Sequence, residues 1–216
     1  MRDPEIPESG ESSSIETIVS DLKSGDQIRI DAAIGRLELM DAGALSATCG
    51  LFLENLVFAC YRKGPSKSAN ERPILKIVEK IGEPALAHLR KLMEKPGNYR
   101  LAILVCIILA KTDHPAAAPG ARAKLGAFIE GPDEVVARYA IDAMVVIGDE
   151  YVVDYLRLVA LKTNPSQSIR ADCAKALGRI GDKRAIPDLE DALRDPSWSN
   201  VRPVAKWALF ELNKNK

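Results

Sequence analysis

Residues 169–195 read IRADCAKALGRIGDKRAIPDLEDALRD, and this stretch decides the fold. Alanine and leucine recur at helical spacing on both sides of the Gly181-Asp182 pair. Glycine closes a helix cheaply because it adopts the left-handed conformation, and an aspartate that follows it can cap the next helix. Pro187 falls near the start of that next helix, where a missing amide hydrogen does least harm. The stretch therefore predicts two helices joined by a tight turn, over 167–180 and 183–194.

The same pattern returns on both sides of this stretch. VARYAIDAMVVIGDEYVVDYL (136–156) aligns with it at an offset of 33 residues, and VRPVAKWALFELN (201–213) aligns at an offset of 32. Weaker copies lie at 80–93 and 99–111. The turns then fall at positions 82, 111, 148, 181 and 213, with spacings of 29 to 37 residues. A period in this range is typical of a helical solenoid, so a repeating unit explains the stretch better than a single site does.

The repeated pattern Ile/Val-Arg-x-x-Ala-x-x-Ala-Leu-Gly-x-Ile-Gly-Asp-x-x-Ala-x-Pro-x-Leu resembles HEAT repeats, specifically the PBS lyase (bilin lyase) HEAT-like subtype. The resemblance implies an all-α fold, a right-handed α-α superhelix of about five helical-hairpin repeats. It is strongest over 133–213 and weaker over 80–132, whereas 15–79 is helical by periodicity with a poor repeat match. We expect one HEAT-like domain over 15–216, preceded by a disordered acidic tail over 1–14. The resemblance is specific for fold and says little about function, because the subtype occurs in many proteins that are not lyases.

Composition narrows the class of protein. The 30 basic and 30 acidic residues balance, so no overall positive charge points to nucleic acid. The apolar run at 101–110 is too short to span a bilayer, and the polar first residues do not form a signal peptide, which predicts a cytoplasmic protein. The four cysteines form no Cys-x-x-Cys pair and are expected to be buried free thiols.

No catalytic or metal-binding constellation is apparent. The chain has two histidines, His88 and His114, which we expect at a boundary position and in a loop. Another HEAT-like family, deoxyhypusine hydroxylase, binds iron through His-Glu pairs, and no such dipeptide occurs here. No Gly-x-Ser-x-Gly, P-loop or Gly-x-Gly-x-x-Gly motif is present. We therefore predict no enzyme activity, no metal and no cofactor.

The helix before each turn suggests where a partner binds. Its recurring apolar positions face the core, and the variable positions between them face the side that is concave in HEAT solenoids. Arginine and aromatic residues on an otherwise polar surface are typical binding anchors. The candidate partner-binding residues are Lys76, Lys80, Arg138, Tyr139, Asp142, Lys175, Arg179 and Trp207.

Two further features of the repeats are an entirely apolar helix and a recurring arginine. The helix at 99–111 is apolar on all sides, so Leu101, Val105 and Leu109 are either covered by the N-terminal helices, as we expect, or exposed for a partner. Three arginines recur at one repeat position, and we expect them to bond acidic residues and carbonyls of the neighbouring repeat rather than to form an anion ladder. They are Arg100, Arg170 and Arg202.

These features favour a non-catalytic scaffold that binds a protein or peptide in its concave groove. A bilin-lyase-like subunit stays open as an alternative on the subtype resemblance alone. So does a nucleic-acid-binding protein like the HEAT-like alkylpurine glycosylases, which the basic and aromatic candidates support and the neutral charge opposes.

Overall fold

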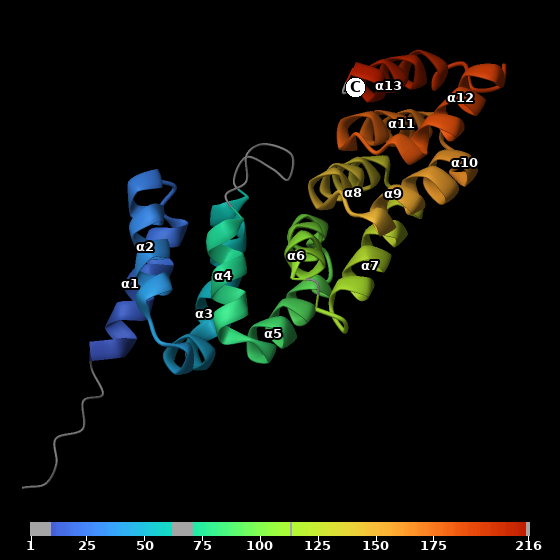
Figure 1. The fold of residues 1–216 in the computed structure, drawn as a ribbon. Helices are drawn as coiled ribbons and strands as arrows, with labels where there is room; N and C mark the ends of the chain where they lie inside the picture. The colour runs from blue at the N-terminus through green and yellow to red at the C-terminus, as the bar shows by residue number, and fades with distance from the viewer. Residues whose placement is uncertain (1–9, 62–70, 113, 215–216) are drawn as a thin grey trace, which may run out of the picture.

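The computed structural model describes residues 10–61, 71–112 and 114–214, and every regular element in them is helical. The helices are arranged in two rows that curve together, so that one row lines the concave side and the other the convex side (Figure 1). We call these the inner row and the outer row. This is the all-α repeat superhelix that the sequence predicts.

The outer row contains the first helix of each hairpin. Its members are α1 (Gly10–Lys23), α3 (Ala42–Cys60), α5 (Glu83–Met93), α7 (Ala118–Glu130), the continuous segment α9–η1–α10 (Glu150–Tyr155, Leu156–Ala160 and Leu161–Thr163), and η2–α12 (Lys183–Ala185 and Ile186–Arg194).

The inner row contains the second helix of each hairpin. Its members are α2 (Gln27–Leu39), α4 (Arg72–Ile81), α6 (Tyr99–Lys111), α8 (Glu134–Ile147), α11 (Gln167–Ile180) and α13 (Arg202–Lys214). The described residues thus form six hairpins instead of about five. The extra hairpin lies before residue 82, where helices form without the repeat signature.

The repeated turns have the predicted chemistry. Gly148 and Gly181 end α8 and α11 with φ of 62° and 84°, in the left-handed region that favours glycine. The aspartates that follow them cap the next segments: Asp149 accepts from the amide of Val152, and Asp182 accepts from that of Arg184. The main repeat therefore has the boundaries expected from its sequence.

The N-terminal end begins earlier than expected. Helix α1 starts at Gly10, so residues 10–14, assigned above to the acidic tail, belong to the helix; residues 1–9 lie outside the described part of the chain. Ile15, Ile18 and Leu22 are buried and anchor α1 on the core. Extending an anchored helix costs little compared with nucleating one, which explains why polar residues join it.

One hydrophobic core runs the length of the described solenoid, from Ile15 to Leu212. Every residue of α6 from Leu101 to Ala110 is buried. Helices α3 and α5, which precede α6, and helices α7 and α8, which follow it, pack around α6. The chain itself therefore covers the apolar face at 101–109, but the expected N-terminal helices provide only part of this cover. Helix α3 is long and apolar enough to cross a membrane by length and composition, and seven of its residues lie in this core.

The four cysteines are buried free thiols, as predicted. Burial raises the pKa of Cys60 and of Cys106 to about 12, so very little thiolate forms at pH 8. We expect an aromatic disulfide reagent at pH 8 to leave the folded protein unmodified over minutes and to label four thiols after unfolding in guanidinium. Rapid labelling of a thiol in the folded protein would contradict its place in the core.

Candidate functional site

Four of the predicted site residues meet between α8 and α11 on the inner row. The Arg138 Nε lies 3.0 Å from Asp172 Oδ2, and the Arg179 Nη1 lies 3.0 Å from Asp142 Oδ1. These reciprocal ion pairs join two repeats and flank a cleft of about 140 Å³. Lys175 lines the same cleft, is exposed and forms no ion pair within the described chain. Two of the three cations therefore have partners already, and Lys175 is available.

Aromatic side chains flank this cleft along the row. Tyr139 of α8 lies beside Tyr99 of α6 with ring centroids 6.3 Å apart, and each residue is 41% exposed. Trp207 of α13 is 39% exposed, and its Cζ3 would lie 3.0 Å from a Cβ placed on Gly178. Exposed aromatic residues thus lie on three inner helices. Tyr99 was not predicted, although its place at the start of a repeat helix could have suggested it.

The two predicted lysines of α4 do not join this group. The ammonium group of Lys80 donates to the backbone oxygens of Glu38 and Met40, and Lys76 Nζ lies 3.8 Å from Glu38 Oε1. Both lysines therefore bind the C-terminal end of α2. Free carbonyls at a helix end attract cations, which explains the position of Lys80. Residue spacing alone did not show this role.

The recurring arginines differ from one another. The Arg170 guanidinium lies 4.9 Å from the ring centroid of Trp198, which belongs to the following repeat. This contact is a stacking on an aromatic ring and not the expected ion pair. Arg100 and Arg202 are exposed and form no ion pair in the part of the chain that the structure describes. The prediction that the recurring arginines bond acidic residues of the neighbouring repeat was therefore wrong for Arg100 and Arg202.

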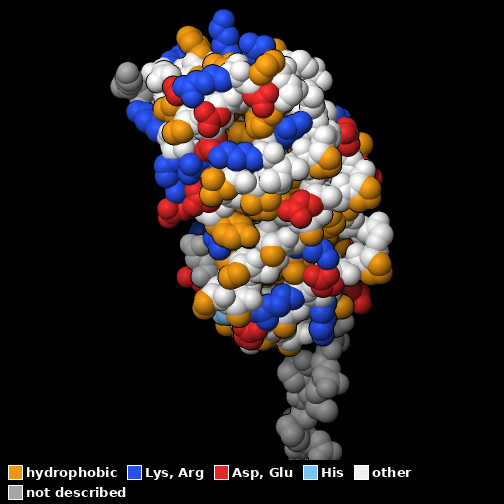
Figure 2. Space-filling view, turned by 90° about the vertical axis from the view of Figure 1, so that its right-hand side faces the viewer, with side chains coloured by type: hydrophobic (Ala, Val, Ile, Leu, Met, Phe, Trp, Pro, Cys, Tyr) orange, Lys and Arg blue, Asp and Glu red, His pale blue; other side chains and the backbone are white. Residues whose placement is uncertain are grey.

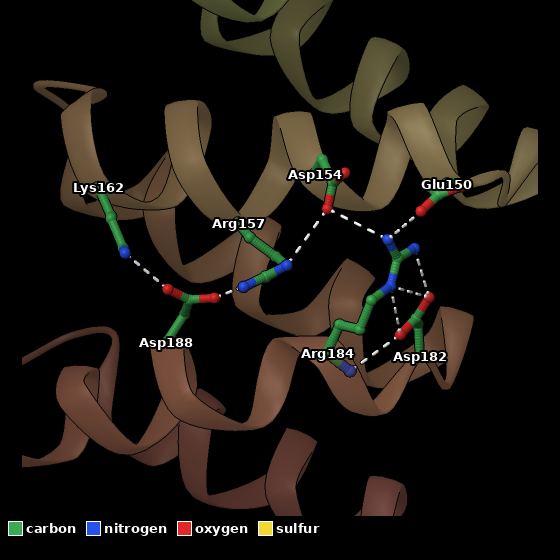
Figure 3. Close-up of polar contacts among 7 residues, drawn as sticks. All are labelled: Glu150, Asp154, Arg157, Lys162, Asp182, Arg184 and Asp188. Atoms are coloured by element: carbon green, nitrogen blue, oxygen red, sulfur yellow. Dashed lines mark hydrogen bonds and ion pairs between the residues drawn. The ribbon is translucent and has the colours of Figure 1, made fainter.

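A polar network that the sequence did not reveal joins two segments of the outer row (Figure 3). The carboxylate of Asp188 in α12 forms ion pairs with Arg157 Nε and Lys162 Nζ, each at 2.6 Å. Arg184 binds Asp182 at 2.8 Å and reaches Glu150 at 2.7 Å. Asp188 is only 5% exposed, so this network fastens neighbouring repeats.

A second cavity, of about 370 Å³, lies where α4, α5 and the C-terminal end of α6 meet. Leu75, Val78 and Leu86 give it an apolar wall, and Lys111 and His114 lie at its polar side. His114 is half-buried rather than free in a loop, and its Nε2 lies 3.7 Å from Glu83 Oε2. The cavity could accept one large apolar side chain.

The remaining histidine fits the expected boundary position. His88 is half-buried beside Gly50, and burial followed by the charge of Lys91 lowers the pKa of its imidazole. Among the described residues, no three His, Cys, Asp or Glu side chains converge as metal ligands.

Comparison with known proteins gives the fold type. A protein-family model described as HEAT repeats matches residues 122–209, and the PBS lyase subtype stays a prediction. A designed armadillo repeat protein in complex with the peptide (KR)4 is similar over 92% of this chain and 99% of its own, with 20% identity and a TM-score of 0.50. Computationally designed armadillo repeat proteins for modular peptide recognition are similar over 91% of this chain and 99% of theirs, with 21% identity and a TM-score of 0.47. No curated protein matches the chain. The fold is a HEAT- and armadillo-like helical-repeat solenoid.

Proposed function

We propose that this protein is a non-catalytic, cytoplasmic scaffold that binds a protein or peptide segment along its inner row. The observation that carries the proposal is the exposed set Tyr99, Tyr139, Lys175 and Trp207 on four successive inner helices. A few such anchors on an extended curved surface supply most of the affinity of a repeat protein. The designed armadillo protein in complex with a peptide supports this use of a helical solenoid.

The ion pairs decide which residues can test the proposal. Changing Arg179 to a glutamate would place two carboxylates together, since Asp142 lies 3.0 Å from Arg179, and would disturb the fold as well as the surface. Lys175 has no ion-pair partner in the described chain, and Tyr139 has only the exposed ring of Tyr99 beside it. The informative variant is therefore Lys175→Glu with Tyr139→Ala.

A matched control exists on the outer row. Lys183 is exposed with no ion pair inside the described chain, and Tyr151 is 47% exposed. Lys183→Glu with Tyr151→Ala repeats the same chemical changes on the opposite side of the solenoid.

We expect the immobilised wild type and the outer variant to retain the same proteins from a lysate of the source cells. The inner variant should lose at least nine-tenths of that material, read by quantitative mass spectrometry. Hydrogen exchange of the wild type with the captured protein should show protection in α8 and α11. Equal capture by both variants, or protection confined to the outer row, would overturn the proposal. Circular dichroism and thermal melting check that both variants fold.

A further inference from the structure

The two rows of helices differ in charge although the whole chain is neutral. The inner row contains 14 Lys and Arg residues against 7 Asp and Glu, whereas the outer row contains 10 against 11. Figure 2 views the molecule from the side of α7, α10 and α12, and there basic and acidic side chains are intermixed. The excess of seven positive charges therefore belongs to the row that lines the concave side.

Ion pairing within the inner row does not remove this excess. The three acidic residues of α8 and α11 are already paired: Glu134 and Asp172 contact Arg138, and Asp142 contacts Arg179. Other inner-row cations have no ion-pair partner in the described ranges. Among these are Arg72, Arg100, Lys175, Arg202 and Lys206. A partner that carries carboxylates could pair with them without displacing an existing contact.

The inner row also offers an apolar anchoring place. Helices α6, α8, α11 and α13 pack closely in succession, but α4 and α6 hardly contact each other. The cavity of about 370 Å³ lies at this interruption, where the C-terminal ends of α4 and α6 meet α5 of the outer row. Its volume is near the lower end of ligand pockets, roughly 300–1,000 Å³. With Leu75, Val78 and Leu86 on its wall, it suits the side chain of a leucine, methionine or phenylalanine.

We propose that the inner row binds an acidic peptide segment that carries one large apolar side chain. This inference rests on the proposed function and names the chemistry of the partner. A nucleic acid fits less well, because it has no aliphatic side chain to enter the cavity lined by Leu75, Val78 and Leu86.

The test is fluorescence anisotropy with the full chain and four labelled probes in 50 mM salt. Two probes are acidic peptides: (DE)2L(DE)2, and (DE)4, which is the same peptide without leucine. The other two are the basic peptide (KR)4 and a 20-nucleotide single-stranded DNA. The basic peptide is the ligand of the designed armadillo neighbour. We expect the leucine-containing acidic peptide to bind most tightly, (DE)4 to bind at least threefold more weakly, and (KR)4 not to bind.

Matched variants locate the binding. Lys175→Glu should weaken the binding of the leucine-containing acidic peptide at least fivefold. Lys183→Glu on the outer row should change the affinity for this peptide less than twofold. Leu75→Trp, which fills the apolar cavity, should abolish the advantage of leucine.

The outcomes separate this inference from the proposed function. Tighter binding of (KR)4 than of the acidic peptides, weakened in the inner variant alone, would overturn the acidic partner and leave a peptide-binding inner row. Tighter binding of the DNA would overturn both in favour of a nucleic-acid surface. A failure of all three peptides to bind would overturn the acidic partner alone, because the capture experiment tests the peptide-binding inner row independently. An equal loss of peptide binding in Lys175→Glu and Lys183→Glu would show that the attraction is a non-specific effect of charge, and would overturn the inference.

Discussion

Replacing Asp188 with asparagine is expected to lower the free energy of unfolding by about 3 kcal/mol at pH 7. The carboxylate is nearly buried and receives Arg157 and Lys162 at 2.6 Å each. Removing its charge leaves two neighbouring cations without their anion, and Arg157 is itself largely shielded from solvent. Breaking a buried pair on one side costs more than the pair contributes, because the remaining charge is left desolvated.

The control for this variant lies on the same helix. Glu190 forms an exposed pair with Arg194 four residues later, so Glu190→Gln should change stability by less than about 0.5 kcal/mol. Urea unfolding followed by circular dichroism measures both variants. Equal effects of the two substitutions would contradict the structural role of Asp188.

The pH dependence of this pair has a defined sign. Burial alone would raise the pKa of Asp188, but the hydrogen bonds from Lys162 and Arg157 outweigh it and hold the pKa below its ordinary value. The pKa of an aspartate in an unfolded chain is about 3.9. The pair therefore contributes fully to the free energy of unfolding above that pH, and this contribution is lost as the pH falls through the lower pKa of the folded state. The stability gap between wild type and Asp188→Asn should therefore be constant from pH 5 to 7 and narrow below about pH 4. A gap unchanged at pH 3 would contradict this origin.

Replacing Gly178 with alanine is expected to destabilise the protein by about 1–3 kcal/mol. A Cβ at this position would lie 2.8 Å from both the Cα and the Cβ of Ala208, so α11 and α13 would have to separate. Alanine is the better helix former by about 1 kcal/mol, but a contact with backbone atoms cannot relax by rotating a side chain. The steric cost therefore exceeds the gain in helix propensity.

Gly35 provides the opposite case. It lies inside α2, and a Cβ there would have no atom within 4 Å. Gly35→Ala should therefore stabilise the protein by about 0.5–1 kcal/mol. Urea unfolding of both variants gives the comparison, and a stabilising Gly178→Ala would show that α11 and α13 are not in close contact.

Several elements could be predicted from sequence because their causes are local. The Gly148 and Gly181 ends of α8 and α11 follow from left-handed glycine, and the caps at Asp149 and Asp182 involve amides only two or three residues away. The burial of α6 follows from its own apolar circumference. Before residue 82 the repeat signature fades, so the sequence predicts the extra hairpin only as helices without a register.

The candidate site could be predicted only in part. The repeat pattern placed Arg138, Asp142, Lys175 and Arg179 on one face, and the structure brings them to one cleft. It did not show that Lys80 binds the end of α2, because that contact joins residues 40 positions apart.

The sequence by itself determined that this chain is an all-α repeat protein and where its main turns lie. Periodicity and capping act over a few residues, and the sequence displays them directly. Only the tertiary structure decided which cations are paired, which aromatic side chains are exposed and that the positive charge is gathered on the inner row. Those properties depend on packing between helices about one repeat apart, such as the Arg138–Asp172 and Gly178–Ala208 contacts. A neutral total charge cannot reveal such a separation, because it is the same whichever row the charges occupy.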